Sequence, residues 1–437
     1  MADPDNILIV YHRPKLFNPK SPNGIIPTLS KIENSDWLCW TLDINDTENV
    51  ILQLSDVERY YTNFCKVNLW PLFHNFIEKI NRDWTELEHY RKVNKLFAEK
   101  ALMKKKGKIW IHDYNLLLMP KYLRKLDYQG KIYFFFHTAF PDINAFSILP
   151  NSQEIMESLM SCDKLGFHIP RYANIFFNVA NYYYPVDNFK QKAVDQTIYR
   201  GCNSAIFDIK YYTQFVYDNR IIKLTTYPMP LNNSSTSQNT FKKSNNIFSL
   251  ICFSRIDYIK DPLGVLEIYN TILFEKPELI GRVVFHFGCT RSKVKGYSEL
   301  QDRVDHFIHE INTRFAIGDY LPIVYYENGL PNAELIKLYE SMDCCIIGSL
   351  CDGLNMVAKE YINHNRVDGH LLLSHFAGVS VEIDGPILFN PYHKNEVKQK
   401  LINIITNNNS NSFNFSYMKK QISMTNINDW VQTHTSD

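Results

Sequence analysis

Short apolar runs alternate with helical patterns along this chain, and this alternation is the feature that most limits its fold. In the first half, strand-like runs lie at Ile7–Tyr11, Ile109–Ile111, Ile132–Phe136 and Leu165–Phe167, with helical patterns such as Val93–Lys104 between them. A strand, a helix and a further strand in this order typically form a parallel sheet with helices on its faces. The sequence therefore predicts an α/β fold.

The alternation occurs twice. Leu231–Asn246 is rich in Asn, Ser, Thr and Lys, which indicates a linker. Strand-like runs resume after it, at Ile247–Cys252, Val283–Phe287, Ile323–Tyr326 and Cys344–Ile347. A length of 437 residues suffices for two or three cores. We therefore expect two Rossmann-like domains with a cleft between them, where ligands often bind.

A second polar joint, Asn407–Asn414, is almost entirely Asn and Ser. Behind it we expect one final helix over Tyr417–Thr433, with Met418, Ile422 and Trp430 on its apolar side.

Composition excludes several classes of partner. The formal net charge is +1, so the chain lacks the basic field that nucleic-acid binding usually needs. Met1–Asn6 has no signal-peptide pattern, and no run of 18 apolar residues predicts a membrane span. The nine cysteines show no CxxC spacing, which favours a reducing compartment. We expect a cytoplasmic protein without nucleic-acid or membrane partners; homo-oligomerisation stays open.

The segment Leu350–Tyr361 carries chemistry. Asp352 and Gly353 stand just before an apolar helical run that contains Glu360. The free N–H groups at the start of such a helix attract a diphosphate. If the whole stretch were helical, the two carboxylates would be roughly 12 Å apart, which suits opposite ends of a nucleotide sugar. An N-terminal helix cap with one exposed Glu fits the pattern equally well.

A second segment supplies cations. Arg255 and Lys260 follow the strand-like run Ile247–Cys252 and are five residues apart. Two cations in a loop after a strand can bind a diphosphate. A surface loop of ion pairs is the alternative interpretation.

The two segments together resemble the retaining glycosyltransferases of the trehalose-6-phosphate synthase family, glycosyltransferase family 20. The resemblance extends over nearly the whole chain and includes, in family order, Trp110-Ile-His-Asp-Tyr-Asn-Leu, Phe136-His-Thr-Ala-Phe-Pro and Leu373-Ser-His-Phe-Ala-Gly. It implies the GT-B fold, in which two Rossmann-like domains face each other across a cleft. Here these would be residues 1–231 and 247–406, with a C-terminal helix within 415–437 crossing back to the first domain.

The resemblance also implies a donor site without a cofactor or metal. Its residues would be Gly24 near the phosphates, Arg255 and Lys260 on the diphosphate, His137 with Asp352, Gly353, Leu354 and Asn355 on the sugar, and Glu360 on the ribose. The donor would be UDP-, ADP- or GDP-glucose. The acceptor would carry a phosphate, held by Arg13, Tyr61, Trp70 and Arg291, while Asp113 orients its hydroxyls.

The resemblance also decides between two mechanisms. On sequence alone, Asp113 and His137 could form the acid/base pair of a sugar hydrolase. The family instead transfers sugar on one face, and the departing phosphate accepts the acceptor's proton. The catalytic residues would then be Asp113, His137, Arg255, Lys260 and Asp352, which position the reactants and stabilise the leaving charge.

The N-terminal motif Val10-Tyr-His-Arg-Pro and His112-Asp-Tyr-Asn resemble the glucosylglycerol-phosphate synthase branch and the related pseudo-glycosyltransferases. We expect Leu42, which takes the place of a glycine, to crowd a hexose pocket, and Asn115 to change its hydrogen bonds, so glucose 6-phosphate would be a poor acceptor. Trehalose-6-phosphate synthesis, a non-glycosidic pseudo-glycosyltransferase reaction and a non-catalytic sugar-phosphate-binding role stay open. Departures from the family pattern are Ala139, Asp261 and Cys351; Asp261 would place a negative charge beside Lys260.

Overall fold

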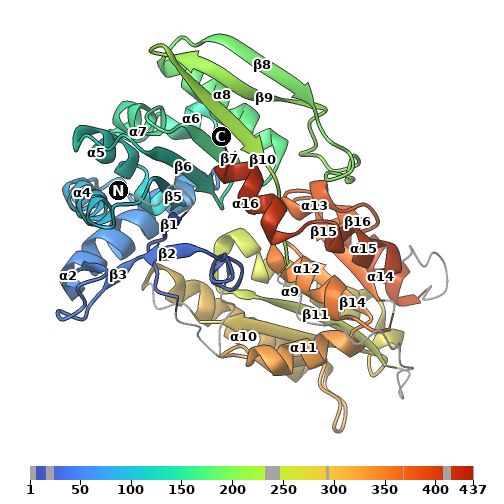
Figure 1. The fold of residues 1–437 in the computed structure, drawn as a ribbon. Coiled ribbons are helices and arrows are strands. Elements are labelled where there is room, and N and C mark those ends of the chain that lie inside the picture. Colours follow the sequence, from blue (N-terminus) through green and yellow to red (C-terminus); the bar gives the residue numbers. More distant parts are fainter. Residues whose placement is uncertain are drawn as a thin grey trace.

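The structure is a computed structural model that describes residues 6–15, 24–231, 247–291, 295–367, 369–406 and 415–436. Two α/β units lie side by side, each with a sheet between layers of helices (Figure 1). We call the unit on the eight-stranded sheet the first domain and the unit on the six-stranded sheet the second domain. The expected linker Leu231–Asn246, apart from Leu231, and the expected joint Asn407–Asn414 lie outside the described residues.

The sheet of the first domain has the strand order β2-β1-β5-β6-β7-β10-β9-β8. Its strands are β1 Ile7–Val10, β2 Ser35–Leu38, β5 Lys108–His112, β6 Lys131–Phe136, β7 Lys164–Phe167, β8 Asp187–Ala193, β9 Lys210–Tyr217 and β10 Arg220–Thr226. The pairs from β2 to β10 are parallel, whereas β9 and β8 join antiparallel at one edge. Five of the six residues of β6 are buried, as expected for a strand covered on both faces.

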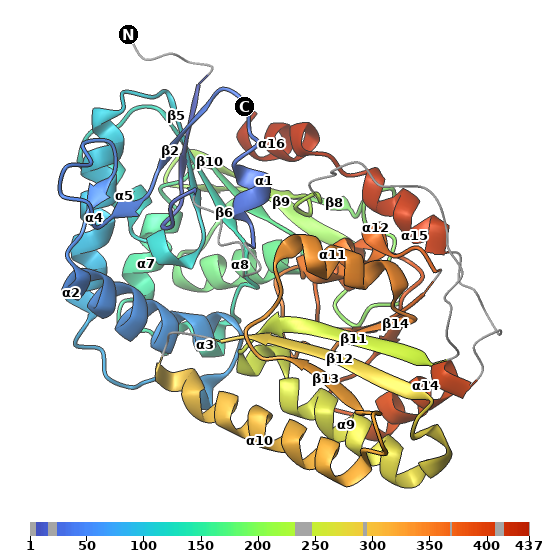
Figure 2. The ribbon, with the colours of Figure 1, turned by 90° about the horizontal axis from the view of Figure 1, so that it is seen from below.

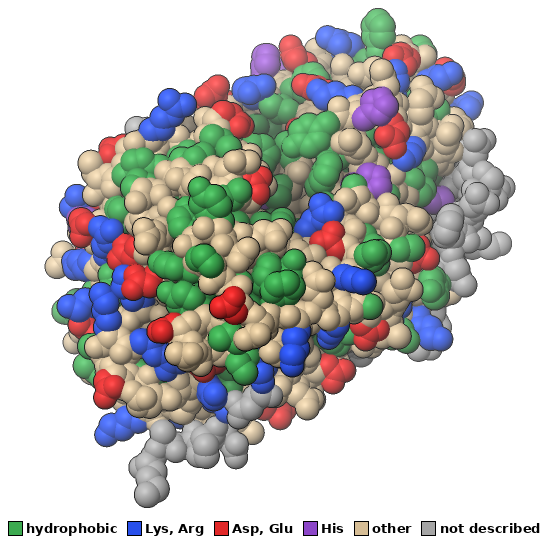
Figure 3. Space-filling model, turned by 90° about the horizontal axis from the view of Figure 1, so that it is seen from above, with side chains coloured by type: hydrophobic (Ala, Val, Ile, Leu, Met, Phe, Trp, Pro, Cys, Tyr) green, Lys and Arg blue, Asp and Glu red, His purple; other side chains and the backbone are tan. Residues whose placement is uncertain are grey.

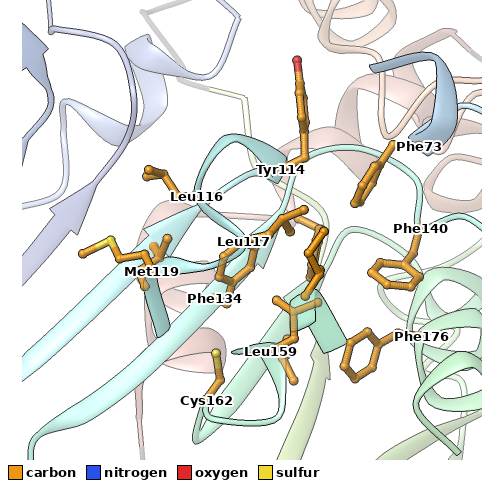
Figure 4. Packing of buried hydrophobic residues seen from close by; sticks show 14 of the residues in the cluster. Phe73, Tyr114, Leu116, Leu117, Met119, Phe134, Phe140, Leu159, Cys162 and Phe176 are labelled. Carbon is orange, nitrogen blue, oxygen red and sulfur yellow. The ribbon is translucent and has the colours of Figure 1, made fainter. Parts of the chain in front are cut away.

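Helices cover both faces of this sheet. They are α1 Ile26–Leu29, α2 Leu54–Val57, the π-helix η1 Glu58–Leu69, α3 Trp70–Phe73, α4 Leu87–Met103, α5 Met119–Lys125, α6 Ile143–Phe146, α7 Ser152–Leu159 and α8 Pro170–Tyr183. A small parallel pair, β3 Trp40–Thr41 and β4 Val50–Ile51, lies apart from the main sheet. Aromatic rings fill the core beneath: in Figure 4, Phe73, Phe140 and Phe176 lie along one side of the cluster. The ring of Tyr114 stands at the edge of this cluster with its hydroxyl directed away.

The second domain has an all-parallel sheet in the order β13-β12-β11-β14-β15-β16. Its strands are β11 Phe248–Arg255, β12 Val283–Thr290, β13 Ile323–Tyr326, β14 Cys344–Ile347, β15 His370–Ser374 and β16 Ile387–Phe389. Its helices are α9 Pro262–Glu275, α10 Ser298–Phe315, α11 Asn332–Ser341, α12 Met356–His364, α13 Val379–Glu382 and α14 Lys394–Thr406. The strands expected from the sequence are confirmed in both domains.

The C-terminal segment corrects the prediction of one final helix. It forms two helices, α15 Phe415–Ser423 and α16 Ile427–Thr435, because the Asn426 side chain accepts a hydrogen bond from the Asp429 N–H and starts a new helix. Helix α15 packs on α12 of the second domain, and α16 packs on β6, β7 and β10 of the first (Figure 2). The Trp430 ring lies 4.7 Å from that of Trp110. The predicted return of the C-terminus to the first domain is confirmed, and α16 makes it.

The described residues include no helix that is both long and apolar enough to cross a membrane. Acidic and basic side chains are interspersed over the face shown in Figure 3, without a large area of one sign.

Candidate active site

A cavity of about 250 Å³ lies between the two domains. Its walls include residues that follow parallel strands: Tyr11 after β1, Asp113 after β5, His137 after β6 and Gly348 after β14. The carboxyl ends of such strands are the usual ligand-binding edge of an α/β sheet. The cavity therefore lies where both sheets present their binding edges.

Thirteen of the fourteen site residues expected from the sequence line this cavity. They are Arg13, Gly24, Tyr61, Trp70, Asp113, His137, Arg255, Lys260, Asp352, Gly353, Leu354, Asn355 and Glu360. The exception is Arg291, which follows β12 outside the cavity lining. Its guanidinium forms ion pairs with Glu327 and, at 3.1 Å, with Asp305. Arg291 is therefore not brought to the cavity in this structure, and its contact with an acceptor phosphate is a prediction that the structure does not test.

Asp352 and Lys260 form the centre of the expected donor site. The Lys260 ammonium donates to Asp352, which also accepts from Asn355 at 2.8 Å and from Ser349 at 3.2 Å. Burial alone would raise the pKa of Asp352, but Lys260 and the hydrogen bond from Asn355 hold the pKa below its ordinary value. Asp352 is therefore ionised and fixed in place. Such a carboxylate suits hydrogen bonds from sugar hydroxyls.

The loop that contains Asp352 and Gly353 contacts the first domain directly. A Cβ at Gly353 would overlap the backbone oxygen of His137, so only glycine allows this approach. The Tyr172 hydroxyl donates to the backbone oxygen of Asp352 at 3.1 Å. The two domains therefore meet at the point where the donor sugar is expected.

Helix α12 starts later than the simple helical estimate assumed. Asn355 is its N-cap, with φ at 83°, and accepts from the Ala358 N–H at 3.1 Å. Asp352 therefore lies in a loop and is not the cap. Glu360 lies in the helix and lines the cavity, and burial raises its pKa to about 7.

The structure resolves the concern about Asp261. This residue has φ at 49°, a conformation that Asp tolerates better than most residues other than glycine. Its carboxylate accepts from the Gly264 N–H at 3.2 Å and thereby caps α9. The Asp261 carboxylate thus caps the start of α9, whereas the Lys260 ammonium pairs with Asp352.

The expected acceptor side is rich in aromatic rings. The Trp70 indole donates to Asp257 at 3.3 Å, and the Arg255 guanidinium lies 5.4 Å from the Trp70 ring centre. The Tyr61 ring stacks on His12 at 5.3 Å. Trp70 therefore links the first domain to the cation loop of the second.

Asp113 and His137 each present to the cavity a side chain with a polar atom that has no hydrogen-bond partner among the described residues. Asp113 has φ at 73°, an uncommon conformation that is typical of functional sites. Within the described residues, its Oδ1 atom and the Nδ1 atom of His137 have no hydrogen-bond partner. Burial raises the pKa of Asp113 to about 6 and lowers that of His137 to about 3. Near neutral pH this places a carboxylate acceptor beside an uncharged imidazole, as hydroxyl binding requires.

The two residues expected to shape the hexose pocket do not line the cavity. Leu42 is 47% exposed beyond β3, and Asn115 is fully buried behind the wall. In this structure Leu42 therefore does not crowd the cavity, and poor use of glucose 6-phosphate stays a prediction.

Sequence reasoning also missed residues of the cavity wall, among them His12, Lys66, His74 and Tyr114. The sequence carries no signal for Lys66, because its alignment with Tyr61 depends on η1 being a π-helix. In a π-helix the hydrogen bonds link residues five apart, so Lys66, five after Tyr61 and four before Trp70, shares their face. Among the described residues, no group of His, Cys, Asp and Glu side chains is arranged to hold a metal ion.

Comparison with known proteins places these features in a family. The model of glycosyltransferase family 20 matches residues 40–437. The chain is 32% identical over 422 residues to a glucosylglycerol-phosphate synthase of Synechocystis sp., covering 87% of this chain and 84% of the relative. It is 30% identical over 411 residues to a UDP-forming α,α-trehalose-phosphate synthase of Pichia angusta, covering 88% and 82%.

Solved structures show the same fold. An E. coli structure bound with UDP-2-fluoro glucose aligns with a TM-score of 0.82 at 22% identity, covering 98% of this chain and 97% of the other. A Burkholderia xenovorans trehalose-phosphate synthase in complex with glucose-6-phosphate aligns with a TM-score of 0.80 at 21% identity, covering 97% and 98%. The two Rossmann-like domains are arranged as in the GT-B fold, and the chain belongs to glycosyltransferase family 20.

Proposed function

We propose that this protein transfers glucose, with retention of configuration, from a nucleoside-diphosphate glucose to a small phosphorylated acceptor of the glycerol 3-phosphate type. One observation carries the proposal: a single interdomain cavity is lined by Arg255, Lys260, Asp352 and Glu360, which suit a donor, and by Asp113 with the aromatic acceptor wall. The similarity to glucosylglycerol-phosphate synthases supports the class of acceptor.

The charges in the cavity support departure of a diphosphate. Arg255 and Lys260 line the cavity from the second domain and offset the negative charge that develops on the leaving diphosphate. An acceptor hydroxyl held by Asp113 attacks the anomeric carbon on the face from which the diphosphate leaves. A new C–O bond forms, the sugar–phosphate bond breaks, and the leaving phosphate oxygen takes the hydroxyl proton. The protein supplies orientation and charge.

The carboxylates fit positioning roles better than nucleophilic attack. Asp352 is engaged by three donors, including the Lys260 ammonium. Asp113 lies with Tyr61, Trp70 and Tyr114 on the acceptor side of the cavity. A covalent glycosyl intermediate is therefore not part of the proposal.

The retained donor set favours an enzyme over a non-catalytic homologue, because Arg255, Lys260, Asp352 and Glu360 all line the cavity. The nine cysteines are free thiols, which supports the cytoplasmic location predicted from the sequence.

A substrate panel tests the proposal. The purified chain is incubated with UDP-, ADP- or GDP-glucose and with glycerol 3-phosphate, glycerol, a phosphorylated cyclitol or glucose 6-phosphate, and release of nucleoside diphosphate is measured. We expect glycerol 3-phosphate to give the highest kcat/KM, at least about a hundredfold above glycerol, because two charge-assisted contacts to the phosphate are lost with glycerol. Glucose 6-phosphate as the best acceptor would instead indicate trehalose-6-phosphate synthesis. Binding of donors and acceptors without release of nucleoside diphosphate from any donor–acceptor combination would indicate a binding protein.

A further inference from the structure

The ammonium of Lys66 lies among three aromatic rings at the cavity wall. Its Nζ atom is 4.4 Å from the ring centre of Trp70, 5.4 Å from that of Tyr61 and 6.0 Å from that of Tyr114. All four residues line the cavity. Aromatic faces attract a cation and direct it, but they do not neutralise its charge.

Lys66 has no carboxylate within ion-pair distance in the part of the chain that the structure describes. Its charge nevertheless acts on neighbouring groups of the cavity: burial, Arg13 and Lys66 lower the pKa of His12, and Lys66 opposes the rise that burial causes in the pKa of Asp113. The ammonium is thus close to the group expected to orient the acceptor, and it can take an anionic partner there.

Arg291 is engaged differently. It is expected from the sequence to contact an acceptor phosphate, yet it pairs with Asp305 and Glu327, outside the cavity lining. The second domain therefore supplies no cation from this position, and the first domain supplies one that the sequence pattern did not indicate.

We propose that Lys66 binds the acceptor's phosphate in the place expected for Arg291, together with Arg13, Tyr61 and Trp70. This inference rests on the proposed function and deepens it. The phosphate site then lies within the first domain, on the side of the cavity that holds Asp113.

The competing interpretation is structural: the ammonium could serve only to hold the three rings together. The two roles differ in what they predict for phosphate. A structural lysine would affect binding of phosphorylated and unphosphorylated acceptors alike, whereas a phosphate ligand affects only the former.

The test compares Lys66→Met, Lys66→Arg and Arg291→Met in the full chain. Binding of glycerol 3-phosphate is measured by calorimetry with the nucleoside diphosphate present, and KM is measured for glycerol 3-phosphate and for glycerol. Loss of one charge-assisted contact should weaken glycerol 3-phosphate binding by about 10- to 150-fold in Lys66→Met. Lys66→Arg should retain most of the affinity, KM for glycerol should stay within about threefold, and Arg291→Met should bind as the wild type does.

The opposite pattern, in which Arg291→Met loses affinity and Lys66→Met keeps it, would overturn the inference, as would equal losses for glycerol and its phosphate. Thermal unfolding shows whether Lys66→Met is folded, and Lys66→Gln replaces it if it is not. The binding arm is independent of turnover. Wild-type chain that binds glycerol 3-phosphate through Lys66 but transfers no sugar would refute the proposed function and leave this inference standing.

Discussion

The most informative substitution is the removal of both expected diphosphate cations, Arg255→Met with Lys260→Met. The Arg255 side chain is 41% exposed and pairs with Asp257 at 3.4 Å, whereas that of Lys260 is 16% exposed. A hydrogen bond to a charged group contributes about 1.5–3 kcal/mol. The better-screened Arg255 belongs at the lower end of this range and Lys260 at the upper end, so the pair should contribute about 4.5 kcal/mol. Donor affinity should then fall by roughly three orders of magnitude.

Isothermal titration with the best nucleotide sugar measures this loss. A matched control is Arg282→Met with Lys276→Met, which removes the same two charges from residues of the second domain that do not line the cavity. The control should bind within about threefold of the wild type. Because Lys260→Met also leaves the Asp352 carboxylate without its cation, thermal unfolding must show that the double variant is folded at the assay temperature. A folded double variant with wild-type affinity for every nucleotide sugar would refute the donor assignment.

Three further predictions follow from buried groups. Burial raises the pKa of Glu360 to about 7, and ribose hydroxyls would favour its carboxylate form, so donor affinity should weaken by up to about tenfold per pH unit below about pH 7. Calorimetry at pH 6, 7 and 8 should show that Glu360→Gln removes this pH dependence. An unchanged pH dependence would contradict the role of Glu360 in binding the ribose. Gly353→Ala should reduce kcat/KM at least tenfold because the new Cβ would overlap the backbone oxygen of His137. The control Gly296→Ala should have wild-type activity, since its Cβ would meet no atom within 4 Å. Equal activities of the two variants would disprove the close contact at Gly353. Lys359→Met should lower the free energy of unfolding by about 3–5 kcal/mol in urea, because Glu382 then stays buried without its cation. Adding Glu382→Leu should recover part of this loss. A Lys359→Met variant as stable as the wild type would contradict the contribution of this ion pair.

The fold could be predicted from the sequence because parallel strands buried on both faces read as continuous apolar runs. The run Ile132–Phe136 falls within β6, and Cys344–Ile347 is β14. The C-terminus was harder. The apolar residues Met418, Ile422 and Trp430 fit one helical face, but the cap at Asn426 divides the segment.

Most residues of the expected donor site could be brought together from the sequence because they come from two short segments. Arg255 ends β11 and Lys260 follows five residues later, and the segment Asp352–Glu360 carries the others except Gly24 and His137. Local spacing is enough to place such residues on one edge of a sheet.

The acceptor side was less predictable because it depends on which side chains pair with each other. Arg291 is drawn away by Asp305 and Glu327, and neither acid is marked by local sequence. Lys66 enters the cavity because η1 is a π-helix, and periodicity at 3.6 residues would not align it with Tyr61. A pattern of residue types cannot distinguish these outcomes without the packed structure.

We propose that one cavity transfers glucose with retention to a phosphorylated acceptor. The most direct measurement is the proton NMR spectrum of the product formed from nucleoside-diphosphate α-glucose and glycerol 3-phosphate, followed with release of the nucleoside diphosphate. We expect an α-linked glucosyl group on the phosphorylated acceptor, in amounts equal to the diphosphate released. A β-linked product, or free glucose in place of a glycoside, would contradict it.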